Sequence, residues 1–463
     1  MSYGQILLNL MTYKELLYMN RDLKKEFLNL YEEIKTNKNS KIFSLLIEAL
    51  FIFYRDLWIN CSDSLEELYC PVYNNDEKKR NERKIDELLD NLLITLKSLD
   101  KGDDSLAEEK LKKIIYGYVR NSNIFKFTIS SNYPYDFIAS ANNFINKAKK
   151  FDPYITSADI FQALRNVWTM NLLQTTFSMD VELTYPIFSY SMLYPYTDNL
   201  IDSNQSSNTE KKERCNRLME RLKGSKLIPH NIYEEKVFRL VEIIEENYPR
   251  RYFYCLYQSL IAINTSQIES LKQYECKENE NIEDIIKLSF IKGGLSVLTD
   301  AYLIKGSLTI EEIMGAFGLG ILLQLIDDLQ DIKQDKKSGS TTIFTYSLRK
   351  QTLTRATVKL LNFARNIIEL LPNEKSPYYN NIKNVLKTNC YLLIFFSISR
   401  VAGQHTKEFI DRIETYYPFT PSYMKNFNSK LNNKWSSIKK LRNITVGKVF
   451  DILLEDDINR KSK

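Results

Sequence analysis

Apolar residues recur at every third or fourth position along most of the chain. The pattern is clear in residues 237–244 and again in residues 360–371. This spacing places apolar side chains on one face of an α-helix, because a helix completes a turn in about 3.6 residues. Convincing strand patterns, with alternating apolar and polar residues between turn signals, are not found. The sequence therefore predicts an all-α fold.

Glycine and proline, which interrupt helices, number only 13 and 11 among 463 residues. Turn-forming or charged residues cluster at the expected breaks, which are 73–77, 101–104, 131–134, 203–209, 277–281, 338–340 and 372–377. Two acidic clusters both lie after residue 150, and the chain after about residue 421 is rich in Asn, Lys and Ser. We therefore predict an N-terminal helical region of unknown role over residues 1–150, a main helical domain over 151–420, and a C-terminal tail over 421–463.

Two clusters of aspartates lie about 130 residues apart in the main domain. The first contains Asp198 and Asp202, and the second contains Asp327, Asp328, Asp331 and Asp335. Residues four apart share one face of a helix, and carboxylates that close raise one another's pKa unless a cation lies among them. Two such stripes facing each other would hold hard divalent ions such as Mg²⁺, which in turn bind a diphosphate. Asp328 is turned by about 100° from Asp327 and faces either the metal or a neighbouring helix.

The helical residues that precede each cluster are apolar, small or aromatic. On the face of the second cluster they are Ala316, Gly320, Leu323 and Gln324, and on that of the first cluster Tyr190 and Tyr194. Acidic pairs also occur on solvated helices, but residues 315–326 contain no charge, which favours burial. We therefore expect a pocket with metal at its mouth and hydrocarbon below, and the two tyrosines either line it or simply pack in the core.

Basic residues near these clusters are candidates for binding a diphosphate. Lys292 precedes Gly293 and Gly294, and a glycine pair inside a helix suggests a local break at which the backbone approaches something closely. The remaining candidates are Arg250, Arg251 and Lys336. Arginine suits bidentate phosphate contacts, whereas lysine acts as a point charge.

Composition excludes several classes of protein. Lys and Arg number 64 against 58 Asp and Glu, and this net charge of +6 gives no sign of a nucleic-acid-binding tail. The six cysteines show no CxxC spacing, which argues against zinc and against a disulfide framework, and the two histidines are too few for the usual catalytic sets. No signal-peptide pattern or transmembrane stretch is evident, so we expect a cytoplasmic protein.

The two clusters resemble the aspartate-rich motifs of the class I isoprenoid (terpene) synthases. Residues 327–331 with Asp335 and 339–342 look like the second motif, and 196–202 resembles the first motif in the form found in bacterial large terpene synthases related to tetraprenyl-β-curcumene synthase. Lys292 falls where those enzymes carry a lysine. The resemblance covers roughly residues 150–420 and implies a helical bundle around a central apolar cavity, closed by three Mg²⁺ ions that bridge the acidic helices and an allylic isoprenyl diphosphate. A homodimer is compatible with it.

Some family features differ in this chain. Asn199 stands where many relatives carry a second acid, and Pro195 where an additional aspartate is often found. The early motif with which chain-elongating enzymes bind isopentenyl diphosphate is missing. These differences favour a terpene synthase that consumes one allylic diphosphate and gives a linear or cyclic terpene. The alternatives are a prenyl diphosphate synthase, a squalene-type condensing prenyltransferase, or a non-catalytic helical scaffold of the same fold.

Overall fold

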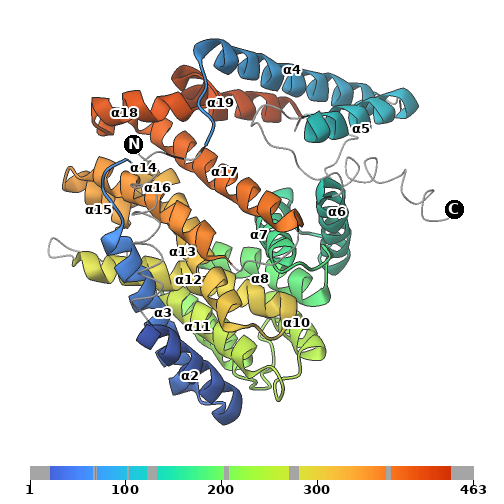
Figure 1. Cartoon of the computed structure of the whole chain (residues 1–463). Coiled ribbons are helices and arrows are strands. Elements are labelled where there is room, and N and C mark those ends of the chain that lie inside the picture. Colours follow the sequence, from blue (N-terminus) through green and yellow to red (C-terminus); the bar gives the residue numbers. More distant parts are fainter. Residues whose placement is uncertain are drawn as a thin grey trace.

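The structure, a computed structural model, describes residues 21–438 apart from 66, 67, 69, 102–103, 122–132, 203–207, 271–280 and 372–376. Every regular element in this part of the chain is helical and none is a strand, which confirms the all-α prediction (Figure 1). The elements are α2 (Arg21–Asn37), α3 (Ser40–Asn60), α4 (Asn75–Asp100), α5 (Asp104–Asn121), α6 (Tyr133–Phe151), α7 (Ser157–Thr176), α8 (Tyr185–Asp202), α9 (Asn208–Leu222), α10 (Ile232–Asn247), α11 (Tyr254–Ser270), α12 (Ile282–Lys305), α13 (Ile310–Gln330), α14 (Ile332–Ser338), α15 (Ile343–Arg349), α16 (Leu353–Leu370), α17 (Pro377–Arg400), η3 (Ala402–Gln404), α18 (Lys407–Ile413), η4 (Glu414–Tyr416) and α19 (Pro421–Ile438).

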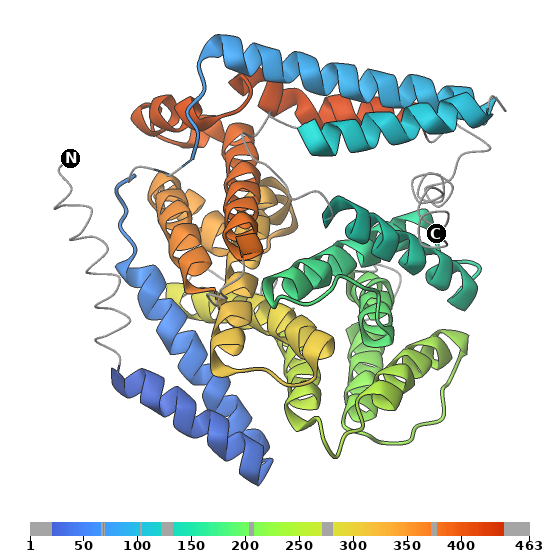
Figure 2. The same ribbon diagram turned by 45° about the vertical axis from the view of Figure 1, so that its right-hand side comes forward.

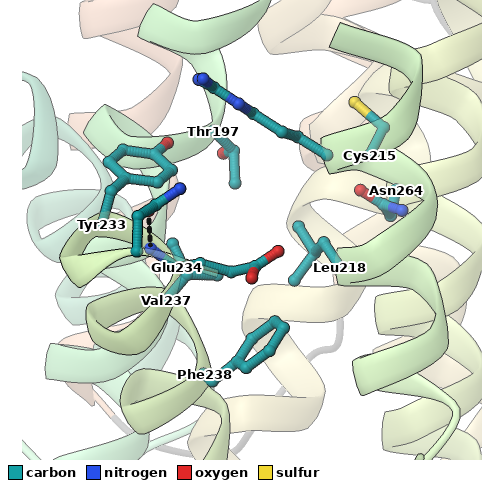
Figure 3. A pocket seen from close by; sticks show the side chains of 10 residues that line it. Thr197, Cys215, Leu218, Tyr233, Glu234, Val237, Phe238 and Asn264 are labelled. Carbon is teal, nitrogen blue, oxygen red and sulfur yellow. Dashed lines mark hydrogen bonds between the residues drawn. The ribbon is translucent and has the colours of Figure 1, made fainter. Parts of the chain in front are cut away.

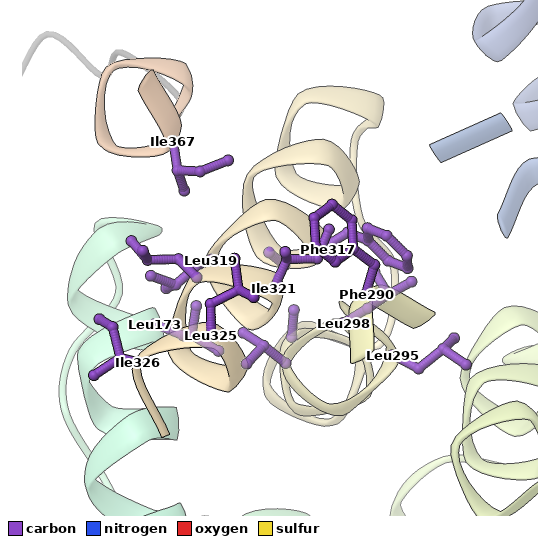
Figure 4. Close-up of a cluster of buried hydrophobic side chains, with 14 of the residues drawn as sticks. Leu173, Phe290, Leu295, Leu298, Phe317, Leu319, Ile321, Leu325, Ile326 and Ile367 are labelled. Atoms are coloured by element: carbon purple, nitrogen blue, oxygen red, sulfur yellow. The ribbon is translucent and has the colours of Figure 1, made fainter. Parts of the chain in front are cut away.

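The antiparallel pair α12 and α13 forms the centre of the molecule. A short connection joins the two helices, and α13 begins at a capping box in which Thr309 and Glu312 each accept a hydrogen bond from the other's backbone N–H. Their buried side chains, including Leu298, Phe317 and Ile321, meet in one apolar core that also takes in residues of α7 and α16 (Figure 4). This core fixes the position of every helix that borders the candidate site.

Glycines allow the backbones of α12 and α13 to touch. A Cβ atom on Gly320 would lie 2.1 Å from the carbonyl oxygen of Gly293, and one on Gly293 would lie 2.5 Å from Cβ of Gln324. A Cβ atom on Gly294 would lie 2.5 Å from the ring of Phe317. The prediction of a close approach at the glycine pair is therefore confirmed, but the predicted break is wrong. Helix α12 runs through both glycines, because the neighbour that comes close is another helix and not a ligand that needs a distorted backbone.

The helices of the first 150 residues lie in different places. Helix α3 packs on α12, and the hydroxyl of its Tyr54 donates to the carbonyl oxygen of Met314 in α13. Helix α4 instead packs against α5 and against α19 from the other end of the chain, at the opposite edge of the molecule (Figure 2). Asp86 of α4 accepts hydrogen bonds from Tyr423 and Lys430 of α19. The N-terminal helices thus take part in two separate layers.

Within the described ranges, no helix combines the length and the apolar character that crossing a bilayer requires. None of the five cysteines described there forms a disulfide, and Cys276 lies outside the described residues.

Candidate functional site

A cavity of about 740 Å³ lies between α7, α8, α11, α12, α13 and α17. Its lining is formed by Gln162, Arg165, Asn166, Thr169, Tyr194, Ile263, Gln267, Ser270, Lys292, Gly293, Ser296, Val297, Asp300, Gly320, Leu323, Gln324, Ile326, Asp327, Gln330 and Leu393. This volume lies within the usual range of small-molecule sites. The crossing of α12 and α13 at Gly293 and Gly320 forms one of its walls.

Several residues singled out in the sequence meet at this cavity. They are Tyr194, Lys292, Gly320, Leu323, Gln324 and Asp327. The hydroxyls of Tyr194 and Ser296 are 3.0 Å apart, which joins α8 to α12 across the wall. Tyr190 and Ala316 are buried but are not part of the lining. Tyr190 packs edge-on against Tyr194 with ring centroids 5.9 Å apart. Tyr190 therefore contacts the cavity wall through Tyr194 and does not line the cavity itself.

The apolar lining that the sequence predicted is found only in part, because polar and apolar groups share the wall of this cavity about equally. Counting back along α13 correctly gave Gly320 and Leu323, but α7 and α11 contribute amides and hydroxyls such as Asn166, Thr169 and Gln267. The sequence contained a signal for α7. Residues 162, 165, 166 and 169 form a polar stripe at helical spacing on a helix whose other face is buried.

The second acidic cluster keeps its helical spacing although α13 ends within it. The backbone N–H of Asp331 donates to the carbonyl of Asp327 at 2.9 Å, and that of Asp335 donates to Asp331 at 2.9 Å. The three residues therefore lie on successive turns. Burial and the charges of Asp331 and Asp327 raise the pKa of Asp335 to about 6, while Lys292 opposes this rise.

Asp327 is the member of this cluster that lines the cavity. Half of its side chain is exposed. The protein that surrounds the carboxyl is nevertheless the main cause of its raised pKa, and the charge of Asp331 raises this pKa further. Arg165 and Lys292 oppose the rise. The nearest nitrogen of Arg165 is 3.9 Å from Asp327 Oδ1, a long and solvent-screened pair. Sequence reasoning did not single out Arg165.

Asp328 faces the neighbouring helix instead of the cavity. Its carboxylate oxygens accept hydrogen bonds from Ser289 Oγ of α12 at 3.3 Å and from Gln324 Nε2 at 2.8 Å. Of the two orientations that the sequence left open, the structure has the one toward α12. Burial raises the pKa of Asp328 to about 7, and the hydrogen bond from Gln324 opposes this rise.

Asp328 should make the protein less stable as the pH rises. Its folded-state pKa of about 7 exceeds the ordinary aspartate value of 3.8. The folded protein therefore binds the extra proton between these values and loses stability as the pH rises across that interval. The loss amounts to about 1.4 kcal/mol for each pKa unit of the difference. We expect Asp328→Asn to reduce the decrease in unfolding free energy between pH 5 and pH 8, measured by urea denaturation, while part of the decrease remains because Asp335 acts in the same direction.

A surface carboxylate provides the control for this prediction. Asp63 is 43 % exposed and pairs with Arg355, so Asp63→Asn should keep the wild-type dependence on pH. If Asp328→Asn showed the same decrease as the wild type, the ionisation of Asp328 would not be linked to folding.

The other basic candidates lie away from the cavity. Arg250 donates to Glu245 at 2.7 Å and to the carbonyl of Leu222 at 2.6 Å, and it lies 4.0 Å above the ring centroid of Tyr257. These contacts hold the corner between α10 and α11 together. Arg251 is exposed beside its neighbouring Tyr252, and Lys336 is exposed on α14. None of the three candidates is among the lining residues.

The first acidic cluster can be placed by its backbone alone. Helix α8 continues through Pro195 to Asp202, so Pro195 lies inside the helix. The side chains of Asp198 and Asp202 lie outside the described residues. A small pocket of about 40 Å³ lies beside the end of α8, with Thr197 and Glu234 among its lining residues (Figure 3). Its volume suits one or two water molecules and not a substrate.

The acidic residues fit a magnesium ion only in part. Among the described side chains, no group of three or more His, Cys, Asp or Glu is placed to hold a metal. Mg²⁺ is usually held by one or two carboxylates and completes its shell with water and substrate phosphate oxygens. Asp327, together with Asp331 or Asp335, offers donors of this kind, provided that other ligands complete the shell.

Comparison of this chain with protein-family models, with curated proteins and with solved structures finds no match.

Proposed function

We propose that this protein is a Mg²⁺-dependent class I terpene synthase that ionises an allylic isoprenyl diphosphate within a helical bundle of that family. One observation carries the proposal. A cavity of substrate size brings together Asp327 of the acidic stripe and two cations, Lys292 and Arg165, which come from different helices. Carboxylates that bind metal and cations that bind phosphate are the two components that a metal–diphosphate site needs.

The residues of the cavity suit the departure of a diphosphate. Lys292 and Arg165 would bind phosphate oxygens and neutralise the charge that grows on them as the carbon–oxygen bond breaks. Asp327, with Asp331 and Asp335 on the following turns, would orient the metal side of the complex. Bound Mg²⁺ would supply Lewis-acid assistance to the leaving group. The ring of Tyr194 in the cavity wall could steady the resulting allylic cation by a cation–π contact.

Binding of a diphosphate analogue together with Mg²⁺ tests this proposal directly. We expect Mg²⁺ plus an alkyl bisphosphonate to raise the melting temperature by roughly 5 °C at about 100 times Kd, and neither component alone to do so. Lys292→Met should remove most of this rise, because it removes a cation from the cavity wall.

Helix α12 offers a matched control for this measurement. Lys287 lies on the same helix but pairs with Glu48 at the surface, at 2.9 Å, so Lys287→Met should keep the full rise. An absent rise, or one that both variants share, would favour the non-catalytic scaffold. Release of diphosphate from one allylic substrate without isopentenyl diphosphate separates a terpene synthase from a chain-elongating enzyme.

A further inference from the structure

Asp300 of α12 is a buried carboxyl in the wall of the cavity. Only 1 % of its surface is exposed, and its Oδ1 atom has no hydrogen-bond partner among the described residues. Lys292, Ser296 and Asp300 are four residues apart and share one face of the helix, so all three line the cavity. Eight residues of helix place Asp300 about 12 Å along the axis from Lys292.

The surroundings of Asp300 favour its neutral form. Burial holds its pKa well above the usual range, and a hydrogen bond with Asn166 opposes the rise only in part. The amide of Asn166 also donates to Ser191 Oγ at 3.2 Å, which fixes its orientation. A neutral carboxyl has both an O–H donor and a carbonyl acceptor.

An unpartnered polar atom in a cavity wall costs free energy unless water or a ligand in the cavity supplies its partner. The neighbouring wall residues Asn166, Thr169 and Ser296 are uncharged. A ligand ammonium group would favour an ionised carboxyl, which burial opposes. A ligand hydroxyl carries one donor and acceptor lone pairs, so it matches both functions of the neutral acid.

We propose that Asp300 forms a hydroxyl-binding subsite, so that this cavity takes a ligand that carries a neutral hydroxyl group at this end. Under the proposed function, the anionic end of the same ligand would lie at Lys292, about 12 Å along α12. Only that placement of the anionic end rests on the proposed function. The hydroxyl subsite itself depends on Asp300 alone and is tested without turnover.

Infrared difference spectroscopy can follow this carboxyl. The carbonyl band of a neutral acid should be present in the wild type and lose the Asp300 contribution in Asp300→Asn, and Asp328→Asn identifies the contribution of another buried carboxyl with a raised pKa. We expect 1-octanol to shift the Asp300 band to lower frequency, because the carbonyl accepts a new hydrogen bond. Nonane, which has a similar length but no hydroxyl, should leave the band in place.

Binding measurements complete the test. Asp300→Leu should weaken the binding of 1-octanol by about five- to tenfold, the loss expected for one hydrogen bond, and should leave or improve the binding of nonane. An unshifted band with 1-octanol, or the absence of a neutral-acid band from the wild type, overturns the subsite. Neither result depends on bisphosphonate binding or diphosphate release, so this proposal and the proposed function can fail separately.

Discussion

Replacing Gly320 by alanine should lower the free energy of unfolding by about 3 kcal/mol. The new Cβ atom would lie 2.1 Å from the carbonyl oxygen of Gly293 and 2.8 Å from its carbonyl carbon. Both atoms belong to the backbone of another helix, so no side-chain rotation relieves the contact and α12 must move away from α13. Urea denaturation followed by circular dichroism measures the loss.

Gly403 provides the matched control for this substitution. A Cβ atom there would meet nothing within 4 Å, and its backbone is not in the left-handed region, so Gly403→Ala should change stability by less than about 0.5 kcal/mol. An equally small effect at Gly320 would mean that the two helices are not as close as the structure places them. Separation of α12 and α13 should also weaken bisphosphonate binding, because Lys292 and Asp327 lie on opposite sides of this contact.

Asp327→Ala should reduce the release of diphosphate from an allylic substrate by about 100- to 1,000-fold while the protein stays folded. Asp327 is the acid of the second cluster that lines the cavity, and it contributes the carboxylate closest to Arg165. The loss should appear mainly in kcat, because a carboxylate that holds the metal acts most strongly as charge develops on the leaving diphosphate. Steady-state release of diphosphate in the presence of Mg²⁺ gives the measurement.

Asp63→Ala serves as the control, since Asp63 is similarly exposed and also pairs with an arginine. It should retain full activity. The melting temperature of Asp327→Ala should stay within a few degrees of the wild type or rise, because removal of a carboxyl from a repelling cluster relieves repulsion with Asp331. A folded Asp327→Ala protein with unchanged turnover would contradict the assignment of this acid to the metal.

The sequence predicted more of one wall of the site than of the others. Lys292, Gly320 and Asp327 were found because each stands out locally, as a charge beside glycines, a small residue in an apolar run, or one acid in a stripe. Arg165 had only the weaker signal of the polar stripe on α7, and Asp300 had no local signal. An arginine in a mixed helix resembles a surface residue, and an aspartate at the end of an apolar run resembles a helix terminus until the opposite wall is known.

Arg250 illustrates the converse case, a charged residue that stands out in the sequence but already has partners in the fold. A Pro-Arg-Arg sequence looks available for an anion, but Glu245 and the carbonyl of Leu222 already bind Arg250, and Tyr257 packs against its guanidinium. These partners lie up to 28 residues away in the chain. The local sequence pattern identifies a charged residue, but it does not identify the distant residues that bind that side chain.

The helical class, the one-face arrangement of the acids and the close approach at Gly293 followed from the sequence alone, because periodicity and glycine chemistry act within a single helix. Only the tertiary structure decided that polar and apolar groups share the cavity wall, that Asp328 turns toward α12 and that Oδ1 of Asp300 lies without a partner in the wall. These properties depend on which helices meet. The burial of a carboxyl, its pKa and its hydrogen-bond partners are set by side chains far apart in the chain, and no local pattern contains that information.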